Sequence, residues 1–345
     1  MALCEGTRVF GDFKRESIVG DKTIKATGSC QEDYSPCTCY STVYADGSTF
    51  LDVFCTDVAS LVAVQSVFRR TTTKSISQFT LRIPSTEAMI PADLLADKGA
   101  RDIYISCSNE STPLTIDSNA FNASKDYTIF MRFSSCNLKT LNYTFLNNFN
   151  VLNTLSYYHF SNITDWTGLP EKLPSLRMIE VNNGTEFEGF QNLPVSSLPA
   201  LNEFYVTNSP IFKHLPTIMP PNFIAMAVDN CPLFQQWDVL GSLTKIQRLT
   251  LNGFTSQNIE DALNSMLNLP NSLSILTLRR NGLARVPPHI RYYSKLQIVD
   301  LSYNNFSTFA NESLAFNSIG LMTLTLTYDG VNTIESAAFQ GVFVR

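Results

Sequence analysis

The sequence predicts an α/β fold: a curved solenoid of leucine-rich units with a concave parallel sheet, an irregular convex side and an N-terminal disulfide cap. Three observations predict it. Apolar residues recur in one register at intervals of about 22 to 28 residues, and four cysteines cluster just before this array. The 345 residues are 44% apolar and only 16% charged, which indicates a large buried core and excludes a disordered or coiled-coil chain.

The clearest unit runs from Leu273 to Leu283 and reads LSILTLRRNGL. It fits the leucine-rich-repeat template L-x-x-L-x-L-x-x-N-x-L at every position. Two units follow it, and eight less regular ones precede it. All eleven begin at or near Ile76, Ala100, Met131, Leu152, Leu176, Leu201, Phe223, Ile246, Leu273, Leu296 and Leu321. We therefore expect an array of about eleven units over residues 59–345.

The template has a physical basis. Its L-x-L core is a short strand whose alternate side chains turn inward, and stacked units place these strands in one parallel sheet. The asparagine or cysteine after the strand turns inward as well and satisfies buried backbone groups. Because one unit cannot bury its own apolar face, both ends need caps. Residues 30–58 are the predicted N-terminal cap and residues 1–29 a leader of uncertain structure, whereas a C-terminal cap is missing, so we expect the chain to continue there.

The predicted cap rests on Cys30, Cys37, Cys39 and Cys55. A cluster of this kind is a disulfide framework or a zinc site. The C-x-C spacing is short for the paired C-x2-C knuckles of zinc sites, and this favours disulfides. Four cysteines allow three connectivities, and the sequence alone leaves them open.

Three further cysteines lie inside the array. Cys136 and Cys231 occupy the asparagine place of their units, where a small buried residue fits. Cys107 falls near the same turn one unit before Cys136, and stacked turns can bring two α-carbons within disulfide range. A Cys107–Cys136 disulfide is therefore the alternative to two buried thiols. The eighth cysteine, Cys4, lies in the leader.

The compartment follows from the cysteines. The first thirty residues carry charges from Glu5 to Glu16 and lack the apolar core of a signal peptide. Disulfides nevertheless favour an extracellular, secreted protein whose start lies upstream, with the cell surface as the alternative. Candidate sites of asparagine-linked glycosylation are Asn109, Asn122, Asn142, Asn162, Asn183, Asn305 and Asn311.

The sequence contains no recognisable catalytic motif. Its three histidines fall in different units, and no nucleophile elbow, metalloprotease, phosphate-loop or dinucleotide motif occurs. We therefore expect no enzymatic activity, no cofactor and no metal. Basic residues never form a run longer than a pair and the net charge is −5, which argues against nucleic acid as a partner. No apolar stretch is long enough to span a membrane.

Binding is expected on the concave sheet, where the predicted outward positions form columns along the array. One column runs Arg132, Glu180, Tyr205, Thr250, Thr277, Asp300 and Thr325, and the next runs Tyr158, Asn182, Thr207, Asp229, Asn252, Arg279 and Ser302. Tyrosine and arginine are enriched at binding hot spots. Two mixed clusters are thus candidates for contact with another protein: Tyr158, His159, Glu180, Glu203 and Tyr205; and Arg248, Arg279, Arg280 and Tyr303. The alternative is a plain solvated sheet.

Several segments resemble a family of secreted arthropod leucine-rich-repeat proteins, that of the non-catalytic subunit of Oplophorus-luciferin 2-monooxygenase. They are Cys37–Cys39 and Leu51–Cys55 of the cap, with Leu301–Asn305 and Ile334–Phe339 of the array, and the similarity covers about residues 30–345. The resemblance implies Cys30–Cys39 and Cys37–Cys55 bonds. It also implies a carrier or accessory subunit whose chemistry belongs to a separate small subunit. The competing hypothesis is the ectodomain of a receptor or adhesion protein of the Toll, chaoptin or Slit-like kind.

Overall fold

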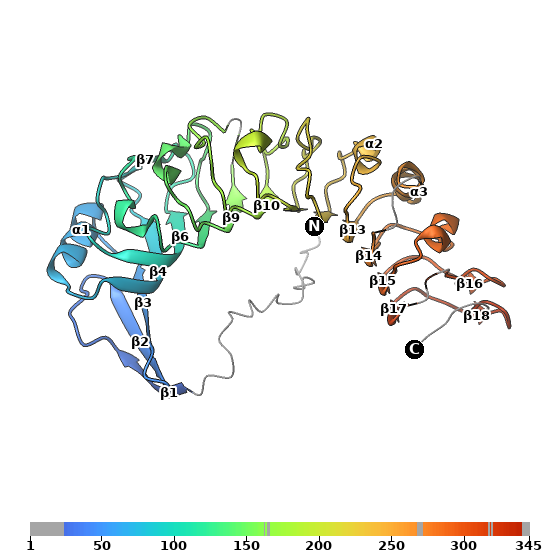
Figure 1. Ribbon diagram of the computed structural model, residues 1–345, viewed down its shortest axis with the longest axis horizontal. Helices are drawn as coiled ribbons and strands as arrows, with labels where there is room; N and C mark the ends of the chain where they lie inside the picture. Colours follow the sequence, from blue (N-terminus) through green and yellow to red (C-terminus); the bar gives the residue numbers. More distant parts are fainter. Residues whose placement is uncertain are drawn as a thin grey trace.

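The computed structural model describes residues 24–339, apart from 162, 164, 165, 268–271, 317 and 319. Within this range the chain forms a 14-stranded, mostly parallel sheet with few helices, so the α/β expectation is confirmed. From β3 onward the strands join the sheet in chain order, which gives a solenoid-like arrangement. The sheet lines the inner side of an arc and the helices lie on its outer side (Figure 1).

The strands of the large sheet are short, mostly three to nine residues. They are β1 (Ile24–Ser29), β2 (Thr38–Tyr44), β3 (Thr49–Cys55), β4 (Ser75–Ile83), β6 (Gly99–Cys107), β8 (Phe130–Ser134), β9 (Thr154–Phe160), β10 (Met178–Gly184), β11 (Glu203–Thr207), β12 (Ala225–Asp229), β13 (Arg248–Asn252), β14 (Ile275–Thr277), β15 (Ile298–Asp300) and β17 (Thr323–Thr325). Two small parallel pairs lie outside it: β5 (Met89–Ile90) with β7 (Thr115–Ile116), and β16 (Thr308–Phe309) with β18 (Thr333–Ile334).

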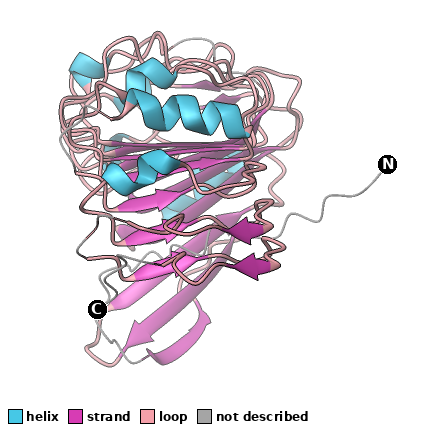
Figure 2. Cartoon of the chain, turned by 90° about the vertical axis from the view of Figure 1, so that its right-hand side faces the viewer, coloured by secondary structure: helices cyan, strands magenta, loops and turns pink. Residues whose placement is uncertain are grey.

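Helices occupy part of the convex side, opposite the sheet (Figure 2). They are α1 (Leu61–Arg70), α2 (Trp237–Leu240) and α3 (Ser256–Ser265), with 3-10 turns at Asn122–Ser124, Tyr143–Leu146, Val195–Ser197 and Pro288–Tyr292. The Ser60 hydroxyl caps α1, and Thr255 and Asn258 form a capping box at α3. Among the described residues, no helix has the length and apolar character needed to cross a membrane.

The register of the sheet stays constant while the chain between strands varies in length. The first outward residue of each strand pairs with the first outward residue of the next, as Met178 does with Glu203 and Glu203 with Ala225. The interval between such residues ranges from 22 (Glu203 to Ala225) to 28 (Asp102 to Phe130). The additional residues are therefore taken up away from the sheet.

The core lies between the sheet and the convex side and runs continuously along the arc. Inward strand residues such as Leu276 and Val299 are completely buried. In the first half, aromatic rings replace many leucines, and Phe190 lies between Trp166 and Phe204 with ring centroids 6.1 and 4.6 Å away. Burial of such large rings contributes strongly to stability. These substitutions make the early units poor matches to a leucine template.

Buried polar side chains after the strands connect neighbouring units from inside, as the template predicts. Asn304 donates from Nδ2 to the carbonyls of Leu278 (2.8 Å) and Leu301 (2.6 Å), and its Oδ1 accepts from the amides of Asn281 (3.0 Å) and Leu283 (3.2 Å). Asn281 makes the same kind of bonds one unit earlier. At the equivalent place, burial raises the pKa of the Cys231 thiol to about 12, and the protonated thiol lies 3.4 Å from the Asp229 carbonyl.

A residue in the left-handed region ends the concave part of nearly every unit. These residues, here called the edge turns, have φ between 46° and 75° and are Ser135, His159, Asn183, Asn208, Asn230, Gly253, Arg280, Tyr303 and Tyr328. Asparagine and glycine adopt this conformation readily, whereas larger side chains do so at a cost of about 1 kcal/mol or more. The chain leaves the concave face at each edge turn.

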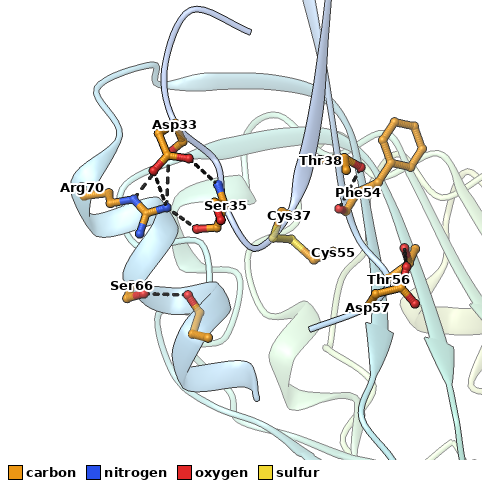
Figure 3. The surroundings of a disulfide bond; sticks show 11 residues. Asp33, Ser35, Cys37, Thr38, Phe54, Cys55, Thr56, Asp57, Ser66 and Arg70 are labelled. Atoms are coloured by element: carbon orange, nitrogen blue, oxygen red, sulfur yellow. Dashed lines mark hydrogen bonds and ion pairs between the residues drawn. A yellow bond between two sulfur atoms is a disulfide. The ribbon is translucent and has the colours of Figure 1, made fainter. Parts of the chain in front are cut away.

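The N-terminal end contains two of the three disulfides found among the described residues. Cys30 is bonded to Cys39 and Cys37 to Cys55, the pairing that the family resemblance implies, so these four cysteines are not free zinc ligands. Figure 3 shows the Cys37–Cys55 bond beside α1, where the Arg70 guanidinium binds Asp33 (3.4 Å) and the Ser35 carbonyl.

The boundaries of the N-terminal end differ from those predicted. Strand β2 is antiparallel to both β1 and β3, and β3 then pairs in parallel with β4. The sheet therefore begins at Ile24, inside the segment predicted as leader, whereas Cys4 lies outside the described residues. Helix α1 follows the cap and was not predicted, because the leucine template does not extend to residues 61–70.

The third disulfide joins Cys107, the last residue of β6, to Cys136. Of the two alternatives predicted for these cysteines, a disulfide between stacked turns and two buried thiols, the structure contains the disulfide. Cys136 is completely buried at the asparagine place, as expected. Cys231 has no disulfide partner and is buried, so the interpretation as a small buried residue holds for it.

Candidate functional site

Two or three outward positions on each strand form the concave face, and the pairing register aligns them into rows. Row A contains Asp52, Gln78, Asp102, Phe130, Thr154, Met178, Glu203, Ala225, Arg248, Ile275, Ile298 and Thr323. Row B contains Phe54, Thr80, Tyr104, Arg132, Ser156, Glu180, Tyr205, Ala227, Thr250, Thr277, Asp300 and Thr325. Row C contains Arg82, Ser106, Ser134, Tyr158, Asn182, Thr207, Asp229 and Asn252. The first predicted column follows row B throughout, and the second follows row C as far as Asn252, whereas its last two members, Arg279 and Ser302, lie beyond the ends of β14 and β15.

The centre of the face is organised around Glu203, the first residue of β11. Its carboxylate is buried and lies 3.0 Å from a guanidinium nitrogen of Arg248 and 3.7 Å from one of Arg177. The Tyr205 hydroxyl donates a 2.8 Å hydrogen bond to the other carboxylate oxygen. Burial, followed by the negative charge of Glu203, raises the pKa of Tyr205 well above 10, so this hydroxyl remains a donor.

Arg248 reaches Glu203 across an intervening strand. Both residues are in row A, and β12 lies between their strands, so the side chain spans about 10 Å. The row A and row B residues of β12 are Ala225 and Ala227, and both are buried although neither belongs to the core cluster. Small side chains here leave room for the arginine to lie over the strand.

A second polar group lies next to the first on β8, β9 and β10. Arg132 donates from Nε to the Ser156 hydroxyl (3.0 Å), and Ser156 donates to Glu180 (2.8 Å). Arg132 also pairs with Glu180 directly at 3.3 Å. The guanidinium lies 5.3 Å from the ring centroid of Phe130, within the distance of a cation–π contact. These side chains hold one another in fixed positions on the sheet.

The first predicted cluster is brought together only in part. Glu180, Glu203 and Tyr205 lie at the centre of the concave face, as predicted. Tyr158 is in row C and its ring contacts His159, which lies in an edge turn and thus at the carboxyl edge of the sheet. There the His159 ring is 2.8 Å from the Asn183 side-chain nitrogen.

The second predicted cluster is separated by the structure. Arg248 belongs to the Glu203 group, and Arg279 pairs with Asp300 through a 2.6 Å hydrogen bond from its Nε. Arg280 and Tyr303 lie in edge turns, so they are not on the concave face; the guanidinium lies 4.9 Å from the Tyr303 ring centroid. Tyr303 in turn stacks with Tyr328 at 5.0 Å. These three residues form an exposed stack along the carboxyl edge.

Sequence reasoning missed Arg132 and Arg177 as members of the central clusters. Arg132 was placed correctly in its column, and the signal for its role was the acidic Glu180 two units later in that column. Arg177 precedes β10 by one residue, outside the L-x-L core, so the template gave no sign of it.

None of the sequons among the described residues is a member of rows A, B or C, although Asn183 directly follows Asn182 of row C. Asn183 is in an edge turn. Asn109 follows β6 and Asn305 follows Asn304, and both lie near the same edge of the sheet. Asn122 is in a 3-10 turn. Asn142 and Asn311 lie in convex segments between strands, and Asn162 lies outside the described residues. Glycans at the described sequons would therefore leave the centre of the concave face uncovered.

A comparison with protein-family models found no match to this chain. Among the described residues, no group of three or more His, Cys, Asp or Glu side chains is arranged to hold a metal ion. The arrangement that remains is an extended face of fixed polar and aromatic groups.

Proposed function

We propose that this chain is a leucine-rich-repeat solenoid that binds another protein on its concave face, as a non-catalytic accessory or carrier subunit of a secreted complex. The observation that carries the proposal is the alignment of outward side chains into rows across eleven successive parallel strands, β4 to β17. A rigid sheet of this kind presents a large, preorganised surface, which lowers the entropic cost of association. The inner asparagines Asn281 and Asn304 support the leucine-rich-repeat interpretation.

The extracellular part of the proposal is supported by the three disulfides, since the cytosol keeps most thiols reduced. Alkylation of the native protein before and after reduction, followed by mass spectrometry, tests it. Cys37 and Cys55 should be protected from alkylation until reduction, while free thiols at both positions would contradict an oxidising compartment. Removal of asparagine-linked glycans from the native protein should also lower its mass.

The binding face can be tested with a photoreactive amino acid. We would place it at Thr250, in row B, and in a second variant at Ile218, an exposed convex residue. Each protein is mixed with extracellular fluid from its native source and illuminated. A defined adduct from the Thr250 variant, with none from the Ile218 variant, is expected. The reverse result would place the binding site on the convex side.

A further inference from the structure

We infer that the centre of the concave face recognises a single carboxylate side chain, Asp or Glu, presented by an otherwise uncharged segment of the partner protein. The recognising groups are the guanidinium groups of Arg177 and Arg248, held in place by Glu203. This inference rests on the proposed function, because it specifies the partner chemistry at the same face.

The charge balance of the Glu203 group leaves room for one anion. Within the described part of the chain, Glu203 is the one acidic partner of both Arg177 and Arg248, so two positive charges share one negative charge. Tyr205 donates a neutral hydroxyl to the same carboxylate and does not alter this balance. Arg132 and Glu180, by contrast, form a one-to-one pair.

Exposure shows which member of the group faces a partner. The Glu203 side chain is 8% exposed, while those of Arg177 and Arg248 are 51% and 36% exposed. The Glu203 carboxylate thus lies beneath the two arginine side chains, which are exposed to solvent. Each guanidinium carries five N–H donors in a planar fork, so donors remain for a second carboxylate.

Positioning is the second part of the inference. A long arginine side chain normally samples many rotamers, and ordering it on binding costs free energy. Arg248 is already extended over the small Ala225 by its bond to Glu203, and Arg177, the residue before the neighbouring strand β10, contacts the same carboxylate. Glu203 therefore acts as a positioning residue for two recognising groups.

The surroundings favour an isolated carboxylate over a polyanion. Glu180 and Asp229 lie on the neighbouring strands β10 and β12, and Asp300 lies further along row B. Their negative charges would repel a highly acidic segment or a sulfated glycan, both of which need a continuous basic surface. An extended, neutral segment with one acidic side chain fits this pattern of charge.

The test uses a fluorescently labelled peptide of Gly, Ser and Tyr residues around one central Glu, and the same peptide with Gln. Fluorescence anisotropy with the full chain should show the Glu peptide binding about tenfold more tightly. The Arg177→Gln/Arg248→Gln variant should abolish this preference, whereas Arg285→Gln, a convex arginine paired with Glu260, should retain it. Equal binding of both peptides to the unaltered chain, or loss of the preference in the Arg285 variant, would overturn the inference.

The Glu203→Gln variant separates positioning from net charge. It removes one negative charge from the face, so attraction by charge alone would strengthen binding of the Glu peptide. If positioning matters, binding should weaken several-fold with an unchanged far-ultraviolet spectrum, and stronger binding would overturn this part. Binding of heparin fragments to the unaltered chain, together with no binding of the Glu peptide, would also overturn the inference. Photocrosslinking from Thr250 that persists in the double arginine variant would refute carboxylate recognition while leaving concave binding intact.

Discussion

Replacement of Asn304 by alanine should destabilise the C-terminal half of the parallel sheet by about 4 kcal/mol. The buried side chain makes four hydrogen bonds of 2.6 to 3.2 Å, two as donor and two as acceptor, to groups in two successive units. Each such bond contributes about 1 kcal/mol net, and its loss leaves buried amides and carbonyls without partners. A loss of this size is exceptional for one residue.

The assay is native-state hydrogen exchange combined with denaturant unfolding. The amides of Asn281 and Leu283 donate to the Asn304 side chain, so their exchange should accelerate most in the variant. Amides of β4 should change little, because a unit interacts only with its neighbours. The exposed Asn332 replaced by alanine is the matched control and should shift stability by less than about 0.5 kcal/mol. If Asn304→Ala costs less than about 1 kcal/mol, the inner asparagines do not stabilise the stack as argued here.

The remaining predictions concern burial, the cap and pH. Leu276→Asp buries an unpaired charge and should unfold several adjacent units at a cost above about 3 kcal/mol. Thr277→Asp, on the outward side of the same strand, should not. Equal melting temperatures for the two variants would show the register to be wrong. Removal of the Cys37–Cys55 bond, which spans 18 residues, by a double change to serine should cost about 3 kcal/mol in denaturant unfolding. Burial raises the folded-state pKa of Asp329, and its Oδ2 has no hydrogen-bond partner among the described residues. The contribution of Asp329 to stability should therefore fall as pH rises from about 4 through this raised pKa. Asp329→Asn should be stabilising relative to the unaltered chain at pH 7 but not at pH 3, as measured by denaturant midpoints at both.

The sequence alone predicted the parallel sheet and the outward columns, since both depend on local periodicity. A strand alternates its side chains strictly, so one correctly placed leucine such as Leu276 determines the orientation of its neighbours. The units near Ile76 and Ala100 matched the template poorly, yet β4 and β6 are the longest strands of the sheet. Most of their inward positions hold isoleucine, with Phe79 in β4, and both residue types suit a strand as well as leucine does.

The candidate clusters were harder to predict because they depend on reach and on turn conformation. Arg248 joins Glu203 only because the alanines of β12 let its side chain lie across the strand, and no spacing rule describes that contact. Arg280 and Tyr303 directly follow the predicted outward residues Arg279 and Ser302 in the sequence, but positive φ values turn the chain away from the sheet at both residues. Left-handed backbone is expected at glycine or asparagine, so these residues gave little warning of it.

The intervals between strands differ in length, so a change in the length of a convex segment is independent of a change in the outward side chains of the concave face. Because units of 22 and 28 residues present their outward side chains in the same register, residues can be gained or lost on the convex side without redirecting any side chain of the concave rows. Evolution can therefore vary the length of this molecule independently of its recognition chemistry. A reporter sequence inserted beside Ile218 offers the same freedom to an experimenter, who could label the protein and leave its binding face in its native arrangement.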